Sequence, residues 1–250
     1  MKLKIISDIH LESFKNSNDF NIGEGDTIIL AGNILIAKHL KCDNLLKEIY
    51  IDFLNECIKN YNNVLYVIGN HEHYGYHFSN TYNTIKENIP DSIHLLENQK
   101  VIIDDWVFIG MTMWTNYNND RNSIFASKKL ENNYELIRIG SNYRRIEPLD
   151  IISTHNESKK YLNKELKNHR KDKVFIITHY APSIESISEE CKNDLICDSY
   201  YSDLTKIIRR SPQIKYWAHG YTNIKNDYII DRCRVLSNPY KNIKNFTVDI

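Results

Sequence analysis

The 250-residue sequence predicts an α/β fold. Three short apolar runs rich in β-branched residues open the chain, at Lys2 to Ser7, Thr27 to Ala31 and Val64 to Ile68. Between the second and the third run, Asp43 to Asn60 places its apolar residues at helical spacing. Because an amphipathic helix is the common crossover between parallel strands, these observations predict a βαβ-type beginning.

The middle of the chain combines a hairpin with a stretch of little periodicity. Val101 to Ile103 and Val107 to Met113 have strand patterns separated by two aspartates, which predicts an antiparallel pair. Residues 117–145 mix Asn, Lys, Arg and Tyr without a clear period, so we expect an irregular cap or loop there, with one short helix around Ile124 to Leu130. We expect residues 1–250, cap included, to form a single domain.

The C-terminal part returns to regular patterns. Helical spacing predicts one helix from Pro148 to Asn168 and another from about Tyr201 to Arg210. The core contacts expected on the longer helix are Leu149, Ile152, Tyr161, Leu162 and Leu166. Apolar runs predict further strands at Val174 to Thr178, Ile214 to Ala218, Tyr228 to Ile230 and Arg234 to Leu236.

Composition excludes several classes of partner. The chain has 32 basic and 32 acidic residues without a long run of either sign, so it carries no nucleic-acid footprint. No segment approaches the roughly 18 apolar residues of a membrane span, and the N-terminus becomes polar too early for a signal peptide. Scattered cysteines without CxxC spacing favour reduced thiols. We expect a cytoplasmic protein without membrane contact, and no pattern indicates its oligomeric state.

Polar clusters stand directly after five of the predicted strands. They are Asp8-Ile9-His10, Gly32-Asn33, Gly69-Asn70-His71-Glu72, Thr178-His179 and His219-Gly220-Tyr221-Thr222-Asn223. The loops that leave strand ends are where open α/β sheets build ligand sites. Each cluster alone is a weak signal, because a single histidine is more often a hydrogen-bonded structural residue than a ligand. Their order along the chain is the informative feature.

In that order the clusters resemble the motifs of the calcineurin-like metallophosphoesterases, which are DxH, GD, GNH(E/D), a lone H and GHxH. The resemblance covers almost the whole chain and is nearest to small single-domain microbial and viral members. The stretches that carry it are SDIHLE, GNHEHYG, IGMTMWT, NYELIRIG, RRIEP, THYAPS, WAHGYTN and LSNPY. The resemblance implies a four-layer αββα sandwich of two mixed β-sheets flanked by helices.

The same resemblance implies a metal site. In this family two divalent cations, drawn from Mn, Mg, Fe, Ni or Zn, clamp a phosphate ester and polarise a bridging water. By the resemblance, Asp8 and His10 hold the first ion, and Asn70 and His179 hold the second. His71 is then the catalytic residue, which assists the leaving group or stabilises the transition state.

Three positions depart from the family pattern. Asn33 stands where the family has its bridging Asp, and Tyr221 and Asn223 stand where GHxH supplies two histidines. An amide has one acceptor oxygen and an NH₂ group that cannot coordinate, so Asn33 removes a charge and the second bridging atom. Tyr221 ligates only as a phenolate, from a reference pKa of about 10, and Asn223 only through a neutral carbonyl. We therefore expect no stable dinuclear centre and at most one weakly bound ion.

Four further polar residues near the motifs are expected to support the site or to bind phosphate. His219 is expected to support its strand, and Glu72 to order its loop by hydrogen bonds to the backbone. Arg144 and Arg145 border the predicted site, and a guanidinium suits phosphate, so both are phosphate-binding candidates. The alternative is that both arginines are ordinary surface residues on a solvated face.

Three functions remain as hypotheses, in this order. The first is an impaired or inactive metallophosphoesterase whose pocket binds a phosphate ester or a nucleotide. The second is an active phosphohydrolase that uses one metal or an unusual metal set. The third is a protein-interaction module without a phosphate-ester ligand. The substrate stays open, because loops and cap rather than metal motifs select the ester.

Overall fold

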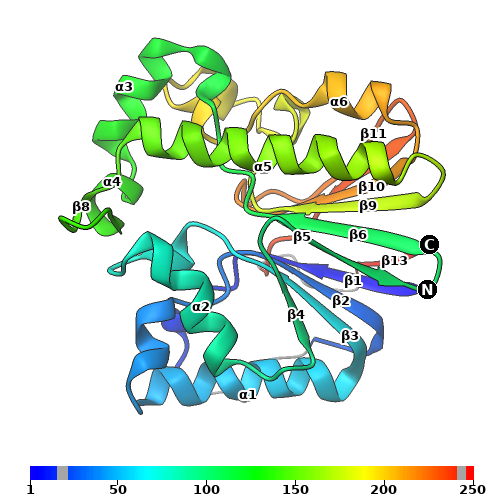
Figure 1. Cartoon of the computed structure of the whole chain (residues 1–250), viewed down its shortest axis with the longest axis horizontal. Coiled ribbons are helices and arrows are strands. Elements are labelled where there is room, and N and C mark those ends of the chain that lie inside the picture. The colour runs from blue at the N-terminus through cyan, green and yellow to red at the C-terminus, as the bar shows by residue number, and fades with distance from the viewer. Residues whose placement is uncertain (16–21, 241–245) are drawn as a thin grey trace.

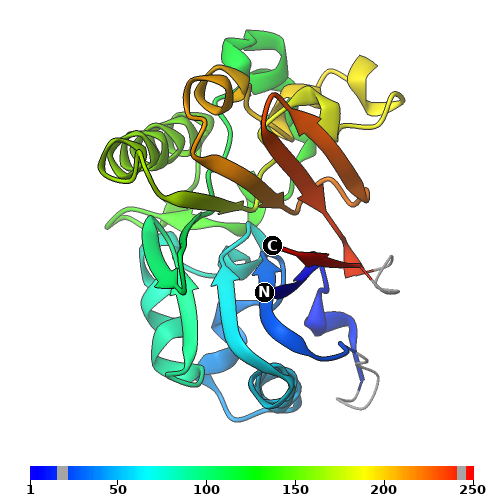
Figure 2. The ribbon, with the colours of Figure 1, turned by 90° about the vertical axis from the view of Figure 1, so that its right-hand side faces the viewer.

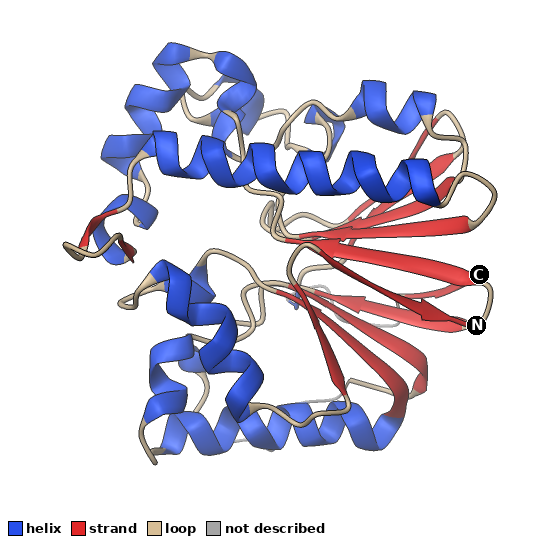
Figure 3. Cartoon of the chain, viewed as in Figure 1, coloured by secondary structure: helices blue, strands red, loops and turns tan. Residues whose placement is uncertain are grey.

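The computed structural model describes residues 1–15, 22–240 and 246–250. Two β-sheets stack face to face, and helices cover the outer side of each sheet, as Figure 1 and Figure 3 show. The predicted four-layer αββα sandwich of two mixed sheets is confirmed. The described helices are all too short or too polar to span a lipid bilayer.

The first sheet contains the strands of the predicted βαβ beginning. Its order is β13-β1-β2-β3-β4, with β1 at Lys2–Ile6, β2 at Gly25–Ala31, β3 at Tyr61–Val67, β4 at Ile93–Leu96 and β13 at Thr247–Asp249. Strands β1 to β4 are parallel, and β13 pairs antiparallel with β1, so the two ends of the chain lie side by side (Figure 2). Helix α1 (Leu45–Asn60) joins β2 to β3 as predicted. Helix α2 (Phe78–Asn88), β4 and β13 were not predicted.

The second sheet begins with the predicted hairpin. Its order is β11-β12-β10-β9-β6-β5, with β5 at Gln99–Ile103, β6 at Trp106–Met111, β9 at Lys173–Thr178, β10 at Ile214–His219, β11 at Asn226–Ile230 and β12 at Cys233–Ser237. The four central strands are parallel, whereas the edge strands β5 and β11 are antiparallel to their neighbours. Both sheets are therefore mixed, and their parallel strands end at one edge.

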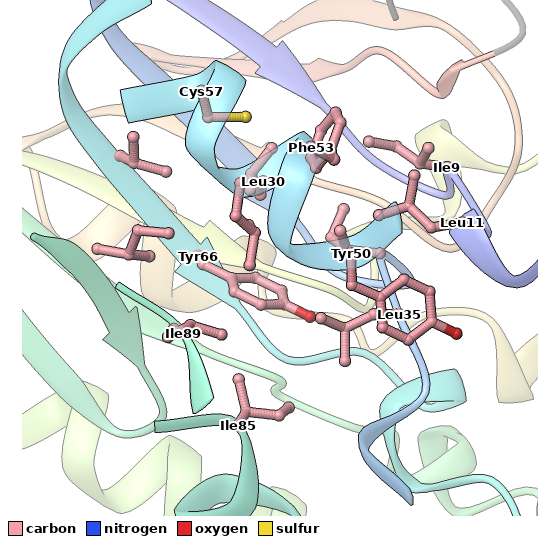
Figure 4. Close-up of a cluster of buried hydrophobic side chains, with 14 of the residues drawn as sticks. Ile9, Leu11, Leu30, Leu35, Tyr50, Phe53, Cys57, Tyr66, Ile85 and Ile89 are labelled. Carbon is pink, nitrogen blue, oxygen red and sulfur yellow. The ribbon is translucent and has the colours of Figure 1, made fainter. Parts of the chain in front are cut away.

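Side chains alternate across each strand and divide the apolar interior into layers. In β2, Ile29 and Ala31 pack between the two sheets, whereas Leu30 faces the helices. Figure 4 shows the helix-facing cluster, where Leu30 lies against Phe53 of α1 and Tyr66 of β3. Because successive side chains point to opposite faces and both faces are buried, these strands have nearly continuous apolar sequences.

The outer layer of the second sheet consists of α5 (Pro148–Asn168) and α6 (Thr205–Arg210). Leu162 and Leu166 of α5 pack on this sheet as predicted, but Leu149 is wrong as a core contact because it is 77% exposed. Leu149 lies off the stripe at i, i+3 and i+4 that buries the rest of the helix face. Helix α6 begins at Thr205 rather than near Tyr201, so the expected helix was too long.

Residues 117–145 are more regular than their sequence indicates. They form α3 (Arg121–Leu130), α4 (Asn133–Leu136) and a hairpin of β7 (Arg138–Ile139) with β8 (Arg144–Arg145). The helix expected near Ile124 is present as part of α3. Tyr117, Tyr134 and Ile137 are buried against Trp114 in an aromatic cluster. Because short elements contribute these side chains from several directions, the cluster leaves no period in the sequence.

Candidate functional site

The polar clusters meet where the parallel strands of the two sheets end. The loops after β1 and β2 are joined by a hydrogen bond from Asp8 N to Gly32 O at 3.0 Å. Across the second sheet, Gly220 N donates to His179 O, also at 3.0 Å. The fold therefore gathers residues from five separate loops at one edge of the sandwich, left of the strand ends in Figure 1.

Glycines allow these loops to approach one another closely. A Cβ added to Gly32 would lie 2.3 Å from His179 Nδ1, and one added to Gly69 would lie 2.4 Å from Asn33 Oδ1. A Cβ on Gly220 would lie 2.5 Å from the Ala31 carbonyl oxygen. The glycines of the three motifs are thus required by close packing around His179.

The loop backbones are strained. Several non-glycine residues of the cluster have left-handed φ angles between 55° and 65°, namely Asp8, His10, Asn33, Tyr221 and Asn223. Such conformations cost of order 1 kcal/mol or more each, and they persist where the surrounding structure imposes them. Their concentration at one place marks this edge of the sandwich as a specialised site.

We call Asp8, Asn33, Asn70, His179 and Tyr221 the rear half of the site. The Asn33 amide donates from Nδ2 to Asp8 Oδ1 at 3.0 Å, and its Oδ1 accepts the backbone N–H of His71 at 3.0 Å. Tyr221 N donates to the other Asp8 oxygen, Oδ2, at 3.0 Å. Both oxygens of this buried carboxylate therefore already accept a hydrogen bond.

His179 lies at the bottom of the rear half. Its Nδ1 is 2.8 Å from the Ala31 carbonyl oxygen, and its Nε2 is 3.1 Å from Asn70 Oδ1. Burial lowers the His179 pKa to about 3, so at neutral pH the ring carries one proton. The Asn70 amide is oriented by bonds from Nδ2 to Tyr74 and Asn133. We assign the ring proton to the shorter contact, which leaves the Nε2 lone pair facing Asn70.

We call His10, Glu12 and His71 the front half of the site. Glu12 Oε1 lies 3.3 Å from His10 Nδ1 and 3.4 Å from His71 Nδ1. Burial alone would raise the Glu12 pKa, but hydrogen bonds from His10 and His71 outweigh it and lower this pKa to about 2. Burial opposes protonation of His10, yet Glu12 raises the His10 pKa above its ordinary value. Glu12 is therefore a carboxylate shared by two imidazoles.

Sequence reasoning did not single out Glu12. It belongs to the SDIHLE stretch, two residues after His10, but its contact with His71 spans 59 positions. Only the meeting of the loops after β1 and β3 reveals it. Within the described ranges, His10, Glu12 and His71 are the one group of three His, Cys, Asp or Glu side chains placed to hold a metal ion.

Glu72 has the loop-ordering role expected of it. Its carboxylate accepts the backbone N–H groups of Asn33 (3.1 Å), Ile34 (2.8 Å) and Gly69 (2.9 Å), and the Tyr66 hydroxyl (2.8 Å). This prediction is confirmed. Burial raises the Glu72 pKa, although these donors oppose the shift. One side chain thereby fixes the loops that carry both halves of the site.

Two of the candidate positions lie toward a pocket beside the rear half. The Tyr221 ring stacks on Tyr180 with centroids 4.3 Å apart, and the Asn223 side chain is exposed, its Nδ2 3.5 Å from Tyr221 O. Both residues line a pocket of about 210 Å³ beside the rear half, together with Ile187, Ser188, Cys191, Tyr200, Thr222 and Ile224. Tyr221 and Asn223 therefore line an adjoining pocket.

The remaining candidates lie outside the cluster. Arg144 forms a bidentate ion pair with Asp150 at 2.7 and 2.8 Å, which occupies its guanidinium, and Arg145 lies exposed beside it on β8. His219 is buried, with Nε2 2.8 Å from Ser186 Oγ, in keeping with a supporting role. The structure thus brings together seven of the ten predicted site residues: Asp8, His10, Asn33, Asn70, His71, His179 and Tyr221.

Sequence comparison agrees with this geometry. The sequence profile of the calcineurin-like phosphoesterases matches residues 1–220. The chain belongs to this family. Its members typically use divalent metals, and the chain has the phosphoester hydrolase fold. A curated relative is the uncharacterized protein L509 of Acanthamoeba polyphaga mimivirus, 28% identical over 261 residues, which cover 94% of this chain and 89% of L509.

Solved structures show the same fold at low sequence identity. Phosphopantetheinyl hydrolase from Mycobacterium tuberculosis matches with a TM-score of 0.65 and 13% identity, over 97% of this chain and 90% of that one. A Staphylococcus aureus protein provisionally assigned as a 5′-nucleotidase, in complex with alpha-ketoglutarate, matches with a TM-score of 0.50 and 12% identity. That match covers 94% of this chain and 48% of the other.

Proposed function

We propose that this calcineurin-like phosphoesterase binds a phosphate ester at the cluster without assembling a dinuclear metal centre, so that its turnover as a hydrolase is impaired or absent. The single observation that carries the proposal is the orientation of Asn33. Its amide N–H group points at Asp8 Oδ1, at 3.0 Å, in the position where the family pattern has a bridging carboxylate. A hydrogen-bond donor therefore stands where two cations would need a shared anion.

The donor set of the rear half does not fit two ions. Dinuclear sites hold their metals about 3.5–4 Å apart, and an anionic ligand between them offsets the repulsion. Asn33 has one acceptor oxygen, which already accepts the His71 N–H, and it supplies no charge. Asp8 is the one carboxylate of the rear half, whose other members, Asn70, His179 and Tyr221, are neutral. A single negative charge is too little for two adjacent dications.

Tyr221 does not restore the lost ligand. Burial raises its pKa well above the ordinary value for tyrosine, with Glu131 adding to the shift, so the side chain is a neutral phenol. Its ring is stacked on Tyr180 and lies edge-on to His179, with centroids 5.3 Å apart. This contact supports an aromatic packing role in place of coordination.

The pocket lined by Tyr221 and Asn223 supports ligand binding beside the cluster. It measures about 210 Å³, and its walls include Ile187, Cys191 and Tyr200. Apolar and aromatic walls next to a polar cluster are typical of sites that hold the organic part of a ligand while polar groups bind its charged end. The two replaced histidine positions thus line a space suited to a small organic group.

Activity assays on the full chain test the proposal. Chromogenic phosphate monoesters and diesters are assayed with Mn²⁺, Ni²⁺, Mg²⁺ or Zn²⁺, for the chain and for the triple variant Asn33→Asp, Tyr221→His, Asn223→His. We expect turnover near the enzyme-free blank for the chain and metal-dependent turnover for the triple variant. Robust turnover by the unaltered chain, lost on His71→Ala, would contradict the proposal and favour an active phosphohydrolase.

Ligand binding is measured separately from turnover. Isothermal titration with inorganic phosphate and with a nucleoside monophosphate is expected to show saturable binding, weakened by Tyr221→Ala for the nucleotide alone. The matched control is Tyr143→Ala, an exposed tyrosine on the β7–β8 hairpin. Absence of binding by both ligands would contradict the binding part of the proposal and favour the interaction-module hypothesis.

A further inference from the structure

The front half of the site has the donor set of a cation site that differs from the family pattern. We propose that His10 Nδ1, Glu12 Oε1 and His71 Nδ1 together hold one divalent transition-metal ion of the Zn²⁺ class. The three side chains come from two loops, after β1 and after β3, and their ligand atoms all lie within 4.8 Å of one another. Two imidazoles and a carboxylate are a ligand set that Zn²⁺ and neighbouring first-row ions accept.

The distances between the ligand atoms fit tetrahedral coordination. Zn²⁺ binds histidine nitrogen and carboxylate oxygen at about 2.0–2.2 Å, so the edges of its tetrahedron measure roughly 3.3–3.5 Å. Glu12 Oε1 lies 3.3 Å from His10 Nδ1 and 3.4 Å from His71 Nδ1, so two edges already have this length. The third edge, between the ligand nitrogens of the two histidines, is no longer than 4.8 Å. Charge-assisted N–H···O bonds measure about 2.7–2.9 Å. The 3.3 and 3.4 Å contacts to Glu12 are therefore long for hydrogen bonds to a carboxylate.

An unsatisfied atom supports the same assignment. Glu12 Oε2 is buried and has no hydrogen-bond partner. A buried carboxylate oxygen without a partner is costly, because water can no longer solvate its charge. A cation bound to this carboxylate would place a positive charge beside the oxygen that lacks a hydrogen bond.

The front half is also open enough to exchange an ion. The side chains of His10, Glu12 and His71 are 27%, 19% and 28% exposed. Partial exposure leaves a path for entry and a free coordination position toward solvent, which is the arrangement of metal sites that bind exogenous ligands. A phosphate oxygen has the chemistry to take that position.

The rear half is the poorer place for a single ion. His179 Nε2 and Asn70 Oδ1 face each other at 3.1 Å, but neither atom carries a charge. The nearby Asp8 carboxylate is engaged by Asn33 and by the Tyr221 backbone. Since a carboxylate provides most of the attraction for a dication, Glu12 favours the front half. This inference goes beyond the proposed function, which concerns the loss of the paired centre.

Metal titration of matched variants tests the inference. Metal-free full-length protein is titrated with Zn²⁺, and with Mg²⁺ as a control ion that prefers all-oxygen sites. We expect one Zn²⁺ per chain for the unaltered protein. Glu12→Gln is expected to weaken Zn²⁺ binding by more than the roughly 10–100-fold that loss of an outer hydrogen-bond partner costs. His179→Ala is expected to change it by less than about 3-fold, as is Glu157→Gln, an exposed charge control on α5.

The opposite ranking would overturn the inference. If His179→Ala abolished Zn²⁺ binding and Glu12→Gln retained it, the ion would lie in the rear half. Thermal melts of the metal-free variants identify a variant that fails to fold. Anomalous scattering at the zinc edge, from soaked crystals of the unaltered chain, needs no variant: we expect one peak between residues 10, 12 and 71. A single peak between residues 70 and 179, or none, contradicts this inference alone, whereas a pair of peaks in the rear half also contradicts the proposed function.

Discussion

The front half lies on the loops after β1 and β3, which also carry Asp8 and Asn70 of the rear half, but the two halves use their polar atoms differently. In the rear half, Asn33 and the Tyr221 backbone donate to both oxygens of Asp8, so this carboxylate is already engaged by internal hydrogen bonds. In the front half, Glu12 has long contacts to two imidazoles and one oxygen without a partner. Both oxygens of the rear carboxylate are thus engaged, whereas the front carboxylate has one oxygen available for a ligand.

The difference shows how one amide can convert a ligand set into a structural network. An aspartate at position 33 would place two carboxylates about 3 Å apart, a contact that needs a cation or a proton between them. Asn33 donates its own N–H instead, and the neighbouring groups pair without a metal. In the front half both imidazoles contact the same Glu12 oxygen, Oε1, and the other oxygen, Oε2, has no hydrogen-bond partner. Three variants test this contrast between the two halves, in order of decreasing expected change in stability.

Glu72→Ala is expected to disrupt both halves at once. Glu72 accepts three backbone N–H groups and the Tyr66 hydroxyl, so its removal leaves several buried donors unpaired. We expect a loss of about 4 kcal/mol in the free energy of unfolding, as for other broken buried charge networks. Urea denaturation measures it, with Glu157→Ala as the exposed control. A loss below about 1 kcal/mol would show that the loops are held by other contacts.

Glu97→Gln is expected to change the pH dependence of stability beneath the rear half. Glu97 accepts the N–H and hydroxyl of Thr112, whose carbonyl accepts His179 N, and burial raises the Glu97 pKa from 4.5 to about 7. Because the folded pKa is the higher one, the folded state binds the proton more tightly. The stabilising effect of the proton on Glu97 is complete below pH 4.5 and is lost as the pH rises through about 7.

Glutamine cannot ionise, so the variant is expected to lack this loss. At pH 8 it should be more stable than the unaltered chain by up to about 3 kcal/mol, and at pH 4.5 the advantage should disappear. Urea denaturation at the two pH values measures the difference. If the free energy of unfolding changed equally with pH in the two proteins, the raised pKa would not belong to Glu97. Glu131, whose pKa burial also raises to about 7, should leave part of the slope in the variant.

Gly69→Ala is expected to separate the two halves. The added Cβ would lie 2.4 Å from Asn33 Oδ1 and 2.8 Å from His179 Nε2, both in the rear half. We expect a loss of about 2 kcal/mol in stability, typical of overpacking, with Zn²⁺ affinity of the front half unchanged within about 3-fold. Thermal melting and Zn²⁺ titration on the same sample measure both quantities. A loss of Zn²⁺ affinity together with the loss of stability would show that the two halves are coupled.

The sandwich and the gathering of its motifs were predictable from sequence because both have a periodic or ordered signal. β-Branched runs and the Asp43 to Asn60 helix pattern identified the first sheet, and α5 was predicted with its correct bounds. The misses have physical causes. Leu149 shares the helical composition but lies off the buried stripe, and Tyr117 packs in a cluster that no single period describes.

The candidate site was predictable in part. Asn33 could be recognised as a departure from its motif, but the direction of its amide, toward Asp8, depends on atoms from another loop. Glu12 could not be recognised, because its significance arises from His71, which is close in space and distant in sequence. Contacts between loops thus determine what the motif residues can bind.

The number of Mn²⁺ ions bound per chain shows whether a paired metal centre forms. Isothermal titration of the metal-free chain with Mn²⁺ is compared with that of the variant Asn33→Asp, Tyr221→His, Asn223→His. We expect at most one Mn²⁺ for the unaltered chain and two for the variant, since only the variant has a bridging carboxylate and the full ligand set. Two Mn²⁺ bound by the unaltered chain with micromolar or tighter affinity would contradict it.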